Sequence, residues 1–69
     1  MSILEDVADD LVQEALKAEA DKGDETIIQK VADAIGNSSP TMQEAFLTQV
    51  RVRRAEMRAR DVLARYQTS

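Results

Sequence analysis

Apolar residues recur at intervals of three and four along most of this chain, which is the spacing of an amphipathic α-helix. Three such runs cover residues 3–20, 27–35 and 40–66, separated by short polar segments that contain glycine, asparagine or serine. No segment alternates apolar and polar residues as a half-buried strand would. The pattern therefore predicts an all-α fold with three helices, over about 2–22, 25–35 and 39–66.

The ends of the predicted helices carry recognisable capping residues. Ser2 and Glu5 have the spacing of a capping box, and Gly23 is placed to end the first helix. Asp24 is a suitable N-cap for the second helix, and we expect Gly36 to close that helix in a left-handed conformation. Ser38 or Ser39 is expected to cap the third helix, with Pro40 in its first turn, where a missing N–H does no harm.

The third helix is unusually long for a chain of this size. About 28 residues at a rise of 1.5 Å give roughly 42 Å, whereas a compact domain of this length has a diameter near 30 Å. Its first half places Met42, Ala45, Phe46 and Val50 on one side, towards the two short helices. A second apolar side, about a third of a turn away, has no evident partner within the chain. We expect it to contact another subunit or another protein through Val52, Ala55, Ala59, Val62, Leu63 and Tyr66.

Composition limits the chemistry that the chain can perform. With 69 residues it makes a single small domain, 1–69, and Phe46 and Tyr66 are its only aromatic residues, so its core is small. The chain has no cysteine and no histidine, which excludes disulfides, Cys/His zinc sites and the common nucleophile–base pairs. The turn at 21–25 is explained by helix capping and lacks the ligand spacing of a calcium loop. We therefore predict no enzyme activity, no cofactor and no metal.

The sequence shows no segment that resembles a membrane span or a secretion signal. No apolar run approaches the length of about 20 residues that spans a bilayer, and the first residues do not resemble a signal peptide. The lack of cysteine fits a reducing compartment. These observations predict a cytoplasmic protein that does not contact a membrane.

The net charge of −4 conceals a strong asymmetry. Residues 1–39 contain ten acidic residues and three lysines, giving −7, whereas residues 40–69 contain six arginines and three acidic residues, giving +3. The two halves can neutralise each other within the fold, or the basic half can attract an acidic protein or a nucleic acid.

Four arginines share one stripe of the third helix and are the candidate electrostatic contacts: Arg51, Arg54, Arg58 and Arg65. The alternative is a solvated face with pairs such as Glu56–Arg60 and Asp61–Arg65.

Residues 28–47 resemble the helix-turn-helix motif of repressor-type DNA-binding proteins, including those of the lac-repressor type. The hydrophobic, small and turn positions of that motif correspond to Val31, Ala32, Ile35, Gly36, Met42 and Ala45. The resemblance implies a small DNA-binding regulator acting as a dimer, with Ser39 and Gln43 as candidate base contacts. Asn37 replaces the usual apolar turn residue, and Glu44 would repel phosphates. We favour a protein-interaction module that binds itself or another protein through the long helix, with DNA binding as the alternative.

Overall fold

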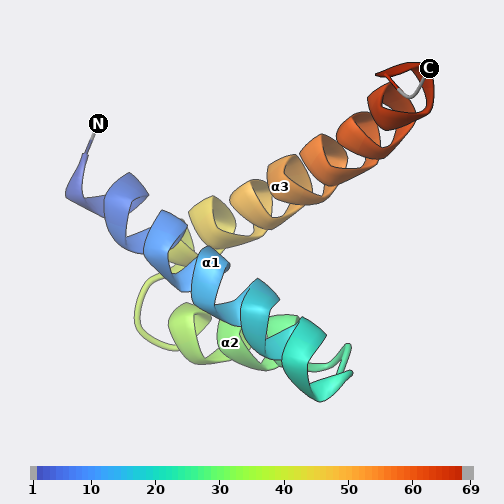
Figure 1. Cartoon of the computed structure of the whole chain (residues 1–69). Helices are drawn as coiled ribbons and strands as arrows, with labels where there is room; N and C mark the ends of the chain where they lie inside the picture. Colours follow the sequence, from blue (N-terminus) through green and yellow to red (C-terminus); the bar gives the residue numbers. More distant parts are fainter. Residues whose placement is uncertain (1, 68–69) are drawn as a thin grey trace.

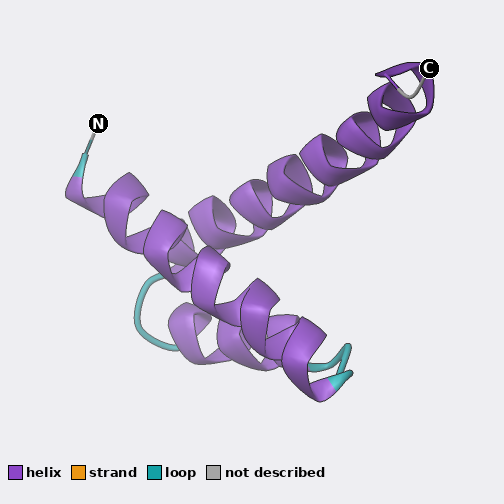
Figure 2. Cartoon of the chain, viewed as in Figure 1, coloured by secondary structure: helices purple, strands orange, loops and turns teal. Residues whose placement is uncertain are grey.

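The computed structural model describes residues 2–67, and over that range it contains three helices and no strand. These are α1 (Ile3–Lys22), α2 (Ile27–Gly36) and α3 (Pro40–Gln67). Each helix packs against the other two, and α1 and α2 meet the first half of α3 (Figures 1 and 2). The predicted all-α fold, with two short helices on a long C-terminal helix, is confirmed, and every predicted helix boundary lies within two residues of the observed one.

Local capping interactions explain where α1 begins and ends and where α3 begins. The Ser2 hydroxyl accepts a hydrogen bond from the Glu5 amide at 3.2 Å, and Gly23 closes α1 with a φ of 63°. The Ser39 hydroxyl accepts from the Met42 amide at 3.1 Å, and Pro40 is the first residue of α3. The two serine hydroxyls and the Gly23 N–H each satisfy a backbone polar group that the helix itself leaves unpaired, and Pro40 lacks the N–H that would be left unpaired there.

The predicted N-cap of the second helix is wrong. Thr26, not Asp24, precedes the first helical residue of α2. The Asp24 carboxylate instead accepts hydrogen bonds from the Thr26 amide at 2.9 Å and the Thr26 hydroxyl at 2.6 Å. These bonds hold the pKa of Asp24 below its usual value, because both favour the charged carboxylate. Asp24 therefore stabilises the turn before α2 rather than its first turn.

The predicted left-handed conformation of Gly36 is also wrong. Gly36 is the last residue of α2, and Gly23 is the one residue with positive φ among residues 2–67. A Cβ atom at Gly36 would lie 2.5 Å from Nε2 of Gln43. That amide donates a hydrogen bond to the Ala32 carbonyl at 3.0 Å. A side chain at position 36 would therefore have to displace the Gln43 amide, which packs directly against the α2 backbone.

A small apolar core joins the three helices. Phe46 and Val12 are its largest fully buried side chains. The cluster of buried residues comprises Val12, Ala15, Ile28, Ala32, Phe46 and Val50. Alanine at two of these positions lets the helix backbones approach closely, and Phe46 fills the space between them. The predicted packing side of α3 is confirmed, since Phe46 and Val50 are buried and Met42 and Ala45 are half-buried.

The second half of α3 extends beyond this core (Figure 1). Residues 55–67 are all exposed, although the helix continues through them without interruption. The molecule is consequently elongated, with extents of 49 × 30 × 13 Å and a radius of gyration of 13.9 Å, against about 11 Å for a compact chain of this length. The fold thus has a packed body and a projecting helical arm.

Replacing Phe46 with alanine should unfold the body, because truncating a buried phenylalanine costs about 3–5 kcal/mol and a small domain has little stability to lose. Circular dichroism during thermal unfolding measures the effect. Leu63→Ala is the matched control, since Leu63 is 55% exposed on the arm and its truncation should leave the body folded. Equal losses of helicity in the two variants would contradict the division between body and arm.

Candidate protein-interaction surface

The six residues predicted to contact a partner form one exposed strip on α3, which we call the outer face: Val52, Ala55, Ala59, Val62, Leu63 and Tyr66. All six are exposed. The exposed fraction is 61% for Val52, 55% for Leu63 and 81% for Tyr66. Exposed apolar residues scattered singly are ordinary, whereas apolar residues gathered on one side of a helix are typical of an interaction surface.

The outer face points away from the packed body. At about 100° per residue, Ala59 lies roughly 220° around the helix from Phe46. By the shorter way around the helix this separation is about 140°, which is close to the expected third of a turn. The two apolar sides of α3 are consequently independent, because one is covered by α1 and α2 and the other faces solvent.

An open groove of about 700 Å³ lies where the outer face approaches the N-terminal part of α1. One wall comes from α1 and contributes Glu5 and Asp9. The residues from α3 are Glu44, Ala45, Thr48, Gln49, Val52, Arg53 and Glu56. The groove combines an apolar floor on α3 with carboxylates on both sides, so it suits an apolar helix that carries positive charge at its edge.

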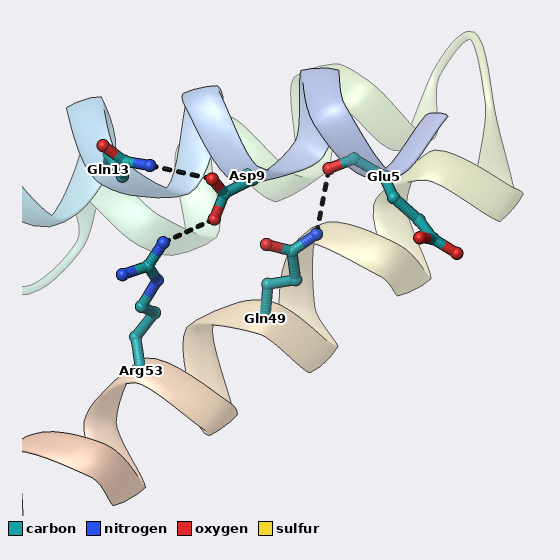
Figure 3. A network of polar contacts seen from close by, with 5 residues as sticks. All are labelled: Glu5, Asp9, Gln13, Gln49 and Arg53. Carbon is teal, nitrogen blue, oxygen red and sulfur yellow. Dashed lines mark hydrogen bonds and ion pairs between the residues drawn. The ribbon is translucent and has the colours of Figure 1, made fainter. Parts of the chain in front are cut away.

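A polar network connects α1 to α3 beside this groove (Figure 3). The Arg53 guanidinium donates to the Asp9 carboxylate at 2.6 Å, and the Gln13 amide donates to the same carboxylate at 2.8 Å. The Gln49 amide donates to the Glu5 carbonyl oxygen at 3.1 Å. The hydrogen bond from Arg53 is the main reason that the pKa of Asp9 lies below its usual value, and Asp9 raises the pKa of Arg53 in return. These contacts fix the direction of the arm relative to α1.

The predicted arginine stripe divides into two parts. Arg54 is half-buried and donates to the Glu19 carboxylate at 2.9 Å, so it joins α3 to α1. Arg51, Arg58 and Arg65 are exposed, and no carboxylate of residues 2–67 lies within ion-pairing distance of them. The expected pair Glu56–Arg60 forms at 2.9 Å. Three of the four candidate arginines are therefore available to a partner.

The candidate base contacts have structural roles within the fold. The Ser39 hydroxyl caps α3, and the Gln43 amide is committed to the Ala32 carbonyl beside Gly36. Both side chains are half-buried. Because both side chains already form hydrogen bonds within the fold, their positions do not support a role in contacting DNA bases.

The acidic wall of the groove and the Asp9–Arg53 pair were not among the predicted site residues. A signal was present, since Arg53 follows Phe46 by seven residues and therefore lies on nearly the same side of α3. A charged residue on the packing side of a helix indicates an ion pair at the edge of the core. The sequence could not identify which acidic residue pairs with Arg53. Several acidic residues lie in α1 and in the loop after it, and only the tertiary structure shows which of them points towards α3.

Replacing Asp9 with asparagine should reduce the loss of stability in acid. Because the pKa of Asp9 is lowered in the folded state, its contribution is present above the ordinary aspartate pKa of about 3.9 and is lost as the pH falls through the lower folded value. Urea unfolding from pH 5 to pH 2 should therefore show a shallower pH dependence for Asp9→Asn. The control is Asp10→Asn, at an exposed neighbouring position. An identical slope in wild type and Asp9→Asn would contradict the assignment.

Comparison with protein-family models, with curated proteins and with solved structures finds no significant match to this chain. None of the helices in residues 2–67 combines the length and apolar character that a bilayer crossing requires. Within the same residues, no three acidic side chains gather as the ligands of a metal ion would.

Proposed function

We propose that this chain is a non-enzymatic protein-interaction module that binds its partner through the outer face of α3. The observation that carries the proposal is that every residue from 55 to 67 is exposed within one continuous helix. Isolated helical segments shorter than about 12–15 residues are marginal in water. A rigid arm of this length is stabilised when its apolar side packs against another protein.

The distribution of exposed large apolar residues supports the same proposal. Four of the seven in the described chain belong to the outer face: Val52, Val62, Leu63 and Tyr66. Arg51, Arg58 and Arg65 flank this strip, and guanidinium groups pair well with carboxylates at the rim of an interface. The module therefore offers an apolar strip with a positively charged edge.

A photo-crosslinking amino acid placed at Ala59 should capture a protein in the cells that produce this chain. Ala59 belongs to the outer face, so its side chain should lie against the partner. Ala64 is the matched control, because it is also an exposed alanine of the arm but points to the side of Phe46, five full turns away. We expect an adduct from position 59 and little from position 64. Equal yields at the two positions, or no adduct from either, would overturn the proposal.

DNA binding makes an opposite prediction that is simple to check. A DNA-binding regulator would bind duplexes with an affinity that falls steeply with salt, with a log–log slope near −0.9 for each phosphate neutralised. We expect negligible binding to pooled random DNA duplexes in a gel-shift titration at 0.15 M salt, because the acidic residues of α1 repel the phosphate backbone of DNA. Binding that is tight, selective for sequence and weakened by Arg51→Ala would show that the helix-turn-helix alternative is correct.

A further inference from the structure

The solvent-facing side of α3 follows a strict alternation of three- and four-residue steps. This series, which we call the seam, runs through Ala45, Thr48, Val52, Ala55, Ala59, Val62 and Tyr66. Such spacing is the a/d pattern of a coiled coil, with Ala45, Val52, Ala59 and Tyr66 at a and Thr48, Ala55 and Val62 at d. Apart from Thr48 and Tyr66, the seam consists of alanine and valine, which allow two helices to approach closely.

The internal core of the molecule does not explain this series. Phe46 and Val50, which are buried against α1 and α2, occupy the b and f positions on the opposite side of the helix. Every seam residue except the half-buried Ala45 is exposed. The seam is thus a second series of residues on α3, separate from Phe46 and Val50, which pack against α1 and α2.

The residues beside the seam indicate which helix would cover it. The g positions hold Glu44, Arg51, Arg58 and Arg65, and the e positions hold Gln49, Glu56 and Leu63. In a parallel pair, each g residue meets the e residue five positions later in the other helix. Arg51 then faces Glu56 of the partner subunit, and Arg58 lays its aliphatic stem over Leu63 of the partner subunit. This arrangement has two symmetric attractive pairs and no like-charge pair.

An antiparallel pair of the same helices is less favourable. There, g residues meet g residues, so Arg51 faces Arg58 of the partner subunit while Glu44 faces Arg65 of the partner subunit. The attraction between Glu44 and Arg65 of the partner subunit is then offset by the repulsion between Arg51 and Arg58 of the partner subunit. Charge therefore selects the parallel arrangement.

We infer that the partner of the outer face is a second copy of this chain, packed parallel and in register along the seam, with Arg51 paired to Glu56 of the partner subunit. This inference rests on the proposed function and names its partner. The α1/α2 body already orders the first turns of α3, so the costly nucleation of the helix is complete before association. The exposed Glu5 carboxylate, on the groove wall at the e side of the seam, adds attraction for the g-position arginines of the second copy, whereas Asp9 is already paired with Arg53.

Sedimentation equilibrium of the purified chain measures the mass, and we expect twice the monomer mass of 7.7 kDa at high micromolar concentration.

Two substitutions with the same charge change then determine the orientation of the two helices. In the parallel dimer, Arg51→Glu should weaken association by roughly tenfold, because it replaces two attractive pairs with repulsive ones. Arg65→Glu should change it little, since its parallel partner position lies outside residues 1–69. An antiparallel dimer would respond in the opposite way, strengthened by Arg51→Glu and weakened by Arg65→Glu.

Disulfide trapping tests the register independently, because the chain contains no cysteine of its own. Ala59→Cys should form a disulfide dimer in a glutathione redox buffer, whereas the control Ala64→Cys, on the opposite side of the arm, should not. A mixture of Thr48→Cys and Ala59→Cys variants that yields mainly the mixed disulfide would indicate antiparallel packing and overturn the inference.

A stable monomer at all concentrations would also overturn the inference, and the proposed function would then be decided separately by photo-crosslinking. An Ala59 adduct with the mass of two chains supports both statements. An adduct of any other mass leaves the interaction module standing and removes the homodimer, whereas the absence of an adduct removes the proposed function itself.

Discussion

The burial of Phe46 at the junction of three helices is the interaction on which the rest of this structure depends. Two of the other five buried residues are alanines, Ala15 and Ala32, and the remaining three are Val12, Ile28 and Val50. Alanines allow the helix backbones to approach but bury little apolar surface themselves. The one phenylalanine therefore supplies much of the buried volume, and it draws α1 and α2 towards the first half of α3.

The position of this core along α3 explains the projecting arm. The last contacts with the body are the ion pairs of Arg53 with Asp9 and of Arg54 with Glu19, one turn beyond Val50. Beyond them the helix has only local support, from alanine, arginine, glutamate and leucine, which are good helix formers, and from the Glu56–Arg60 pair. These local interactions favour the helical conformation but leave the side chains of the arm exposed to solvent. The arm therefore presents an ordered apolar side to solvent, which is the arrangement that an interaction module requires.

The charge asymmetry of the chain has two consequences in different parts of the fold. Near the body, acidic residues of α1 neutralise arginines of α3, and the lowered pKa of Asp9 reflects this pairing. Along the arm, Arg51, Arg58 and Arg65 lie seven residues apart on one edge of the seam. Neutralisation within the fold thus applies to Arg53 and Arg54, and attraction of a partner is what we propose for Arg51, Arg58 and Arg65.

The sequence by itself determined the number of helices, their ends at Ser2, Gly23 and Pro40, and the burial of Phe46. Capping bonds and helical periodicity act within about four residues, so they can be read along the chain. Only the tertiary structure decided that Gly36 makes room for Gln43, that Arg54 rather than Arg51 is paired internally, and that a groove lies beside α1. The Arg53–Asp9 and Arg54–Glu19 contacts join residues 44 and 35 positions apart. Such contacts depend on the directions in which packed helices cross, and the spacing of residues along one helix does not contain that information.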